Sequence, residues 1–260
     1  MVVRFIRDFF DRIKRERLRR CLINQDILPE FYDSDVIVSE RSGFYKLQMT
    51  DKNWQNLFKL QARFCKGYER VLDVGCGPYE LIAVRNDENA VGVDISKAAL
   101  KKLKSFGFKG QVVQADCAYL PFRDLSFDCV LSNQVIEHML TEEALRNSIK
   151  EMERLSKRIM IITPNAAYSR KIYDPTHFFF FTTRSLRRIM PNFEVYAANP
   201  PYSQTLNYYL QYDSPRLKQI PIMGKMIFSM CSKIDSSKFL KWLNRKLWTG
   251  SNLVAIKTEK

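Results

Sequence analysis

The feature that most constrains this chain is a regular alternation, from Arg70 onward, of short apolar runs with amphipathic stretches. Runs such as RVLDVG, AVGVDI and FDCVLSN are typical of strands that are buried on both faces. The stretches between them have apolar residues at helical spacing and are long enough to serve as crossover helices between parallel strands. The sequence therefore predicts an α/β fold with a doubly wound, mostly parallel, seven-stranded sheet. The expected strands are 70–75, 90–95, 111–116, 127–133, 158–165, 193–198 and 253–257.

Helical additions flank and interrupt this pattern. A basic stretch over 1–23 has apolar residues at helical spacing with arginines between them, and a second helix fits 52–66. Residues 24–50 are expected to be irregular. The expected organisation is an N-terminal helical cap (1–67), a ligand-binding α/β domain (68–198), a helical insertion or lid (199–251) and a final strand (252–260).

The chemistry-bearing residues of this pattern lie where predicted strands end. Asp73-Val-Gly75-Cys-Gly77 follows the first strand, Asp94 closes the second and Asp116 closes the third. Glycines at such a turn let the backbone approach a ligand, and an acidic residue after the second strand can accept hydrogen bonds from both hydroxyls of a ribose. Because an open parallel sheet binds its ligand outside the carboxyl ends of its strands, the sequence predicts a nucleotide site at this edge.

Several segments together resemble one known family. VLDVGCG, VGVDIS, QADCAYLPF and SFDCVLSNQVIEHM look like the successive motifs of class I S-adenosylmethionine (SAM)-dependent methyltransferases, with RIMIITPN and DPTHFFFFTTRSLRRIM fitting as well. Within that family, the motifs most resemble the broad small-molecule (methyltransferase type 11-like) group. The resemblance covers roughly 68–198 and the final strand. It implies a Rossmann-like methyltransferase fold, an enzyme and SAM as the cofactor.

The resemblance also assigns site residues. Gly75 and Gly77 would line the methionine and ribose portion of SAM, and Asp73 would help to hold the methionine amino group. The other implied contacts are Asp94 with the ribose diol, Ile95 with the adenine ring, Asp116 and the Cys117 backbone N–H with the adenine edge, and Asn133 with the methionine end. NAD(P) is the competing cofactor, but the full GxGxxG pattern is absent because Glu80 occupies its sixth position.

The chain has two histidines, which are the candidates for general-base catalysis. His138 lies in VIEHM after the fourth strand, where a structural role is the simpler interpretation. His177 lies in DPTH after the fifth strand, and Asp174 could orient its imidazole. We therefore take His177 as the candidate catalytic residue, with a loop-pinning role as its alternative. No metal site is expected, because CxxC pairs are absent and histidines are few.

The formal net charge of +14 favours an anionic partner without choosing among nucleic acid, an acidic lipid surface and a phosphorylated substrate. The primary hypothesis is methyl transfer to a small-molecule or lipid-like acceptor, with O-methylation as the candidate reaction. An RNA methyltransferase and a catalytically decayed SAM-binding protein are the alternatives. The chain shows no signal-peptide pattern, so a cytoplasmic protein is expected, with the basic helices in peripheral contact with an anionic membrane.

Overall fold

The computed structural model of the chain describes residues 13–23, 28–34, 52–167, 174, 176–198 and 252–258. Residues 13–23 are helical. The other helical elements are α2 (Leu28–Asp33), α4 (Lys52–Phe64), α5 (Glu80–Val84), α6 (Lys97–Ser105), the 3-10 turn η1 (Ile136–His138), α7 (Glu142–Leu155) and α8 (Thr183–Ile189). The strands are β1 (Val71–Val74), β2 (Ala90–Asp94), β3 (Gln111–Gln114), β4 (Cys129–Asn133), β5 (Arg158–Pro164), β6 (Glu194–Ala198) and β7 (Asn252–Thr258).

The predicted seven-stranded sheet is confirmed. Its strand order is β3-β2-β1-β4-β5-β7-β6, and the pairings among β1 to β5 are all parallel. The order reverses between β1 and β4, which is the switch point where an open sheet of this kind binds its ligand. The chain divides into two compact units, of which the first holds 1–163, 173–179 and 255–260 and the second holds 164–172 and 180–254.

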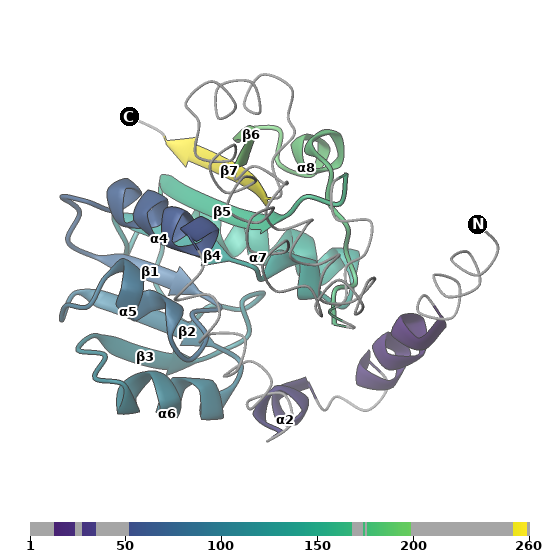
Figure 1. Ribbon diagram of the computed structural model, residues 1–260, viewed down its shortest axis with the longest axis horizontal. Helices are drawn as coiled ribbons and strands as arrows, with labels where there is room; N and C mark the ends of the chain where they lie inside the picture. The colour runs from purple at the N-terminus through teal and green to yellow at the C-terminus, as the bar shows by residue number, and fades with distance from the viewer. Residues whose placement is uncertain are drawn as a thin grey trace, which may run out of the picture. The chain divides into compact units, whose positions relative to one another are not determined.

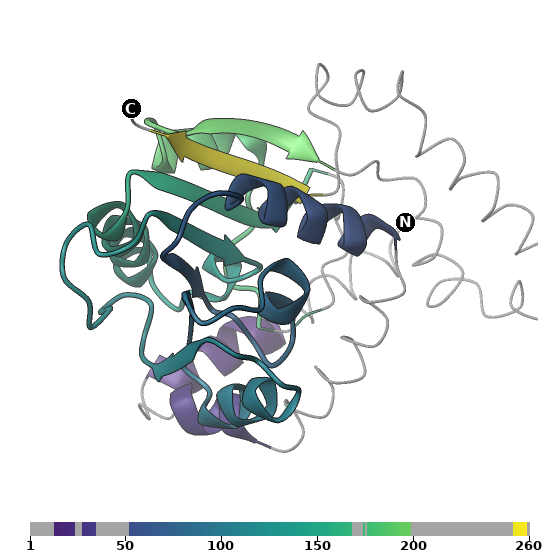
Figure 2. The same cartoon turned by 90° about the vertical axis from the view of Figure 1, so that its left-hand side faces the viewer.

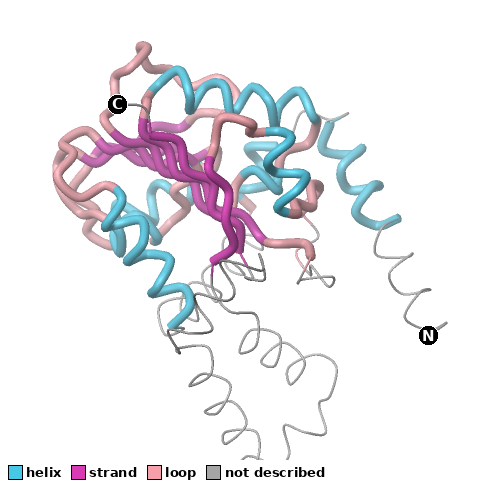
Figure 3. The backbone as a smooth tube through the Cα atoms, turned by 90° about the horizontal axis from the view of Figure 1, so that it is seen from above, coloured by secondary structure: helices cyan, strands magenta, loops and turns pink. Residues whose placement is uncertain are grey.

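Helices cover both faces of the strands of the first unit (Figure 3). Helices α4, α5 and α6 lie on one face, and α7 lies on the other (Figures 1 and 2). A fully buried cluster lies between the β1 turn, β2 and α6, and consists of Cys76, Leu81, Ala90, Leu100, Leu103 and Phe108. Every residue of β1 and β4 is buried, which explains why both strands begin with apolar residues.

Helix starts follow the capping residues that the sequence offers. The hydroxyl of Ser96 accepts a hydrogen bond from the backbone of Ala99 at 3.1 Å, and Thr141 does the same for Ala144 at 3.0 Å. These side chains satisfy backbone N–H groups that the first helical turn cannot pair. Ser96 thereby fixes the start of α6 directly after Asp94, the last residue of β2.

The prediction that residues 24–50 are irregular is wrong at α2. This short helix is stabilised by tertiary contacts that a local pattern does not show. The Asp33 carboxylate accepts hydrogen bonds from the Ser96 hydroxyl at 2.7 Å and from the Ala98 backbone at 2.9 Å. The expected insertion over 199–251 lies outside the described residues, and the proposed domain limits remain predictions.

None of the helices in the described part of the chain is long and apolar enough to cross a membrane.

Candidate functional site

The sheet register brings three predicted ligand residues to one point. Val74 at the end of β1 pairs with Val93 of β2 on one side and with Ser132 of β4 on the other. Gly75, which follows Val74, therefore lies between Asp94, which follows Val93, and Asn133, which follows Ser132. Three segments that are distant in the sequence thus meet at the switch point because parallel strands end at a common edge.

The glycine turn after β1 requires its first glycine for two reasons. Gly75 has a φ of +72°, a conformation that side chains other than glycine rarely adopt, and a Cβ there would lie 2.3 Å from Val135 Cγ2. The backbone N–H groups of Gly75 and Cys76 both donate to Val93 O, at 2.7 and 2.9 Å. The turn is therefore bonded to β2 on one side and packed against the β4 turn on the other.

Asp94 holds the glycine turn and the start of α6 together. Its Oδ2 accepts from Gly77 N at 2.9 Å, and its Oδ1 accepts from Ser96 N at 2.9 Å. The side chain is buried, being 6% exposed. A carboxylate has about four acceptor sites in all, so a side chain in this place can bind backbone N–H groups and ligand hydroxyls together.

A second carboxylate, Glu80, was not among the predicted site residues. It is the first residue of α5, and its Oε2 accepts from Asn133 Nδ2 at 3.0 Å. Burial, followed by the negative charges of Glu80 and Asp94, raises the pKa of Asp73 well above its usual value. Three carboxyl groups and one amide thus surround the glycine turn, which makes this edge suited to a cationic ligand.

The remaining predicted cofactor contacts lie around the ends of β2 and β3. Ile95 is half-buried directly after β2, and Gln114 Nε2 donates to its carbonyl oxygen at 3.0 Å. Asp116 is exposed, and its Oδ1 accepts from Ala118 N at 2.8 Å in the turn after β3. Cys117 is half-buried, with its Sγ 3.6 Å from Met139 Sδ.

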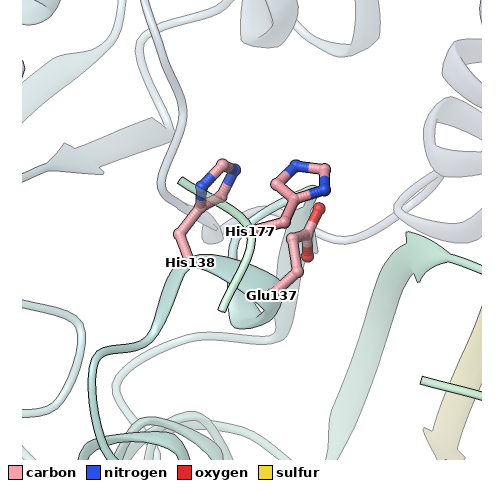
Figure 4. Close-up of side chains that lie close together, drawn as sticks. All are labelled: Glu137, His138 and His177. Atoms are coloured by element: carbon pink, nitrogen blue, oxygen red, sulfur yellow. The ribbon is translucent and has the colours of Figure 1, made fainter. Parts of the chain in front are cut away.

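A second group of polar side chains follows the same edge beyond Asn133. We call Glu137, His138, Asp174, Thr176 and His177 the histidine cluster; Figure 4 shows its Glu137, His138 and His177. The two imidazole rings meet edge-on with their centroids 4.6 Å apart. His177 Nε2 lies 3.8 Å from Asp174 Oδ2, and the orientation of the imidazole by Asp174 stays a prediction.

Main-chain bonds join the two loops of the histidine cluster. The carbonyl oxygen of Glu137 accepts from the backbone N–H groups of Phe178 and Phe179, at 2.8 and 3.0 Å. Gln134 enters the turn with a φ of +58°, a conformation uncommon for residues other than glycine and concentrated at functional sites. The loop after β5 is therefore fastened to the turn after β4.

Residues from the N-terminal part of the chain lie against both parts of this edge. The Arg19 guanidinium donates to Leu140 O and lies over the Phe179 ring at 5.6 Å. The Tyr32 ring contacts His138 edge-on, at 6.5 Å between centroids, and the Tyr32 carbonyl oxygen accepts from the Ser96 hydroxyl at 3.2 Å. Residues in 13–23 and 28–34 therefore contact both the end of β2 and the histidine cluster.

Comparison with known proteins identifies the domain. Residues 72–159 match the family model described as a methyltransferase domain. These residues form a methyltransferase domain of the class I SAM-dependent type. Its fold is similar to that of a SAM-dependent methyltransferase from Archaeoglobus fulgidus, with a TM-score of 0.52, 20% sequence identity, and coverage of 79% of this chain and 92% of that one. The predicted class and cofactor are confirmed, and SAM is the cofactor of the class.

Two curated relatives support the same assignment. The chain is 34% identical over 98 residues to a protein of Mycobacterium tuberculosis named "Probable S-adenosylmethionine-dependent methyltransferase", covering 36% of this chain and 35% of that one. It is 31% identical over 119 residues to the Mus musculus "Probable tRNA methyltransferase 9B", and the match covers 45% of this chain and 26% of that one. The chain spans less than half the length of the curated relatives that it matches.

The residues around the glycine turn fit this cofactor. Asp73 Oδ1 and Asn133 Oδ1 are buried and have no hydrogen-bond partner among the residues that the structure describes. Buried polar atoms of this kind are normally satisfied by some partner. SAM carries an ammonium and a sulfonium group, so an edge lined by Asp73, Glu80 and Asp94 complements its charge.

Proposed function

We propose that the methyltransferase domain transfers the methyl group of SAM to an oxygen atom of a small-molecule or lipid-like acceptor. The observation that carries this proposal is the position of the histidine cluster. It follows Asn133 directly at the carboxyl end of β4, beside the residues that fit SAM. An acceptor held there would lie next to the methionine end of the cofactor, as methyl transfer requires.

The cofactor residues take the roles that the resemblance implies. Asp94 would accept from the ribose hydroxyls while holding Gly77, and Ile95 would pack against the adenine ring. Asp73 and Asn133 offer unpaired buried oxygens to the methionine end. Asp116 and the Cys117 backbone N–H would bind the adenine edge. Gly75 and Gly77 let the backbone come close to the ligand.

Methyl transfer needs alignment more than activation by the protein. SAM supplies a methyl group on a sulfonium that leaves readily. The acceptor oxygen would form a bond to the methyl carbon as the sulfur–carbon bond breaks, and the hydroxyl proton of the acceptor would pass to the His177 imidazole. We propose His177 as the catalytic residue that contacts the acceptor, because its ring is buried at this point and Asp174 lies beside it.

The N-terminal residues favour an acceptor of limited size. Tyr32 contacts Ser96 at one end of the site edge and His138 at the other, where Arg19 also contacts Leu140. A covering segment of this kind excludes water from a reacting centre and restricts the acceptors that enter it. The proposed contact of the basic helices with an anionic membrane rests on 1–22 and 199–251, most of which lies outside the described residues.

RNA is the second candidate acceptor. The net charge of +14 suits a polyanion, and curated relatives include proteins named as tRNA methyltransferases. The decisive experiment incubates the full chain with isotopically labelled SAM and separate pools of metabolites, lipids and RNA, followed by mass spectrometry. Label in the metabolite or lipid pool supports the primary proposal. Label confined to RNA overturns it in favour of the second candidate, and absence of SAM binding indicates a decayed site.

A further inference from the structure

Glu137, His138 and His177 present three donor groups of the kinds that bind metal ions. One donor atom from each residue can be chosen so that all three lie within 4.8 Å of one another. Figure 4 shows the His177 ring between the His138 ring and the Glu137 carboxylate. The three residues come from two loops that the Glu137 carbonyl oxygen fastens together.

The hydrogen bonds of His138 determine which of its nitrogens can act as a ligand. Its Nδ1 contacts Thr176 O at 3.1 Å and Thr176 Oγ1 at 2.8 Å. Thr176 Oγ1 donates its own proton to Asp174 Oδ1, so both contacts of Nδ1 are acceptors and Nδ1 carries the proton. The neutral imidazole therefore has its lone pair on Nε2. Metal-binding histidines are commonly oriented in this way by a carbonyl or carboxylate behind the ring.

The Glu137 carboxylate is held by one oxygen only. Its Oε2 accepts from Thr163 Oγ1 at 2.9 Å, whereas its Oε1 has no hydrogen-bond partner among the described parts of the chain. The residue is 1% exposed. A carboxylate oxygen buried without a partner is costly, and a bound cation is one way in which proteins compensate such a group.

We propose that Glu137, His138 and His177 bind one divalent transition-metal ion next to the methionine end of the SAM site. Two histidines and one carboxylate are a common donor set for Zn²⁺, with a further position left open. Donor atoms around tetrahedral zinc lie about 3.4 Å apart, given its bond lengths of about 2.0–2.2 Å. The donor atoms of the three residues lie within 4.8 Å of one another, so metal binding would draw them closer together.

The metal site deepens the proposed function, on which this part of the inference rests. An oxygen of the acceptor would occupy the open position, where the ion lowers the pKa of a hydroxyl and orients it. With the ion bound, His177 would act as a ligand in place of its role as proton acceptor, and the hydroxyl proton would pass to solvent. This chemistry selects acceptors that offer oxygen, such as a hydroxyl or carboxylate, over sulfur or amine acceptors.

The test measures metal binding directly. The full chain without an affinity tag is treated with a chelator, dialysed against Zn²⁺ or Co²⁺ and analysed for bound metal. We expect one ion per chain and a visible Co²⁺ spectrum lacking the strong near-ultraviolet band of thiolate ligation, which separates the site from the cysteines. His138 and His177 are the two histidines of the chain, so a histidine-dependent signal reports on this cluster.

Matched variants sharpen the result. Glu137→Gln and His177→Ala should each abolish the Co²⁺ spectrum, whereas Glu142→Gln, on the exposed first turn of α7, should leave it unchanged. Thr176→Val removes the hydroxyl behind His138 and should weaken metal binding by about 10–100-fold. Calorimetric SAM affinity and the unfolding temperature verify that each variant is folded.

Two outcomes would overturn the metal site. One is the absence of bound metal in a chain that binds SAM normally, which would leave the proposed methyl transfer intact. The other is a Co²⁺ spectrum that persists in both Glu137→Gln and His177→Ala. Conversely, metal binding without SAM binding would count against the proposed function and not against the metal site.

Discussion

The glycine turn and the histidine cluster adjoin each other at Asn133, yet they are built differently. The turn is positioned mainly by its backbone N–H groups. Those of Gly75 and Cys76 donate to the Val93 carbonyl oxygen, and that of Gly77 donates to the Asp94 carboxylate. The histidine cluster is positioned by a chain of side chains that runs from His138 through Thr176 to Asp174. The first region therefore depends on which residues end the strands, and the second depends on how two loops fold together.

The largest expected effect separates catalysis from cofactor binding. We predict that His177→Ala lowers the turnover of SAM-saturated protein by roughly 10²–10⁴-fold, because it removes the imidazole that we propose contacts the acceptor. SAM affinity should stay near that of the parent chain, since the glycine turn is untouched. Turnover with the identified acceptor and calorimetric SAM titration are the measurements. Normal turnover would return His177 to a loop-pinning role.

The glycine turn itself should be intolerant of a side chain. Gly75→Ala places a Cβ against Val135 and strains a positive φ, so we expect a loss of about 2–4 kcal/mol in unfolding free energy. Gly107 is a matched control, because its φ is +88° but a Cβ added there would meet nothing within 4 Å. Gly107→Ala should cost only about 1 kcal/mol of backbone strain. Urea unfolding measures both.

A rescue variant tests the cause of the Gly75 effect. Val135→Ala removes the methyl groups that the new Cβ meets, so the double variant Gly75→Ala/Val135→Ala should recover the steric part of the loss. Equal losses of unfolding free energy for Gly75→Ala and Gly107→Ala would show that close packing of Gly75 against the β4 turn contributes nothing to stability.

A smaller effect is expected for the proposed ribose acceptor. Asp94→Ala removes a charged acceptor and the bond to Gly77 N, and should weaken SAM binding by about 2–3 kcal/mol. Asp87→Asn changes a carboxylate near the opposite end of β2, where it pairs with Arg85, and should leave SAM affinity unchanged. Unaltered affinity in Asp94→Ala, measured by calorimetry, would remove the ribose assignment.

The smallest effect concerns a proton. Burial, with Glu80 and Asp94 nearby, raises the pKa of Asp73 in the free chain, whereas a bound cation favours the ionised form. At pH values between the free and bound pKa, SAM binding should release a fraction of a proton, and affinity should rise with pH. Calorimetry in buffers of different ionisation enthalpy measures this release. Asp73→Asn should abolish it, and proton uptake by the parent chain would contradict the expected sign.

The same contrast explains how much the sequence could predict. The strands were found to within one or two residues because buried parallel strands are short apolar runs that end in polar turns. The meeting of Asp94, Gly75 and Asn133 followed from the rule that parallel strands end at one edge. These features depend on local patterns and on topology, both of which a single sequence carries.

Other features needed the folded chain. Helix α2 was missed because its contacts through Asp33 involve residues more than 60 positions away. Glu80 was considered only as a departure from GxGxxG, although a carboxylate just after the glycine turn was a usable signal. The hydrogen bonds that link His138 to Asp174 depend on the conformation of Thr176, which the spacing of residues in the sequence does not reveal. The predicted absence of a metal site followed from counting histidines, and the proposed metal site challenges it.

The two hydrogen bonds on the Glu137 carbonyl oxygen determine how this region opens. Phe178 N and Phe179 N share that one acceptor, so their amide hydrogens should exchange with solvent through a single opening event. His177 immediately precedes them in the same segment. We therefore expect the segment that carries His177 to separate from the turn that carries His138 in one cooperative step, so that opening would take the cluster apart as a unit.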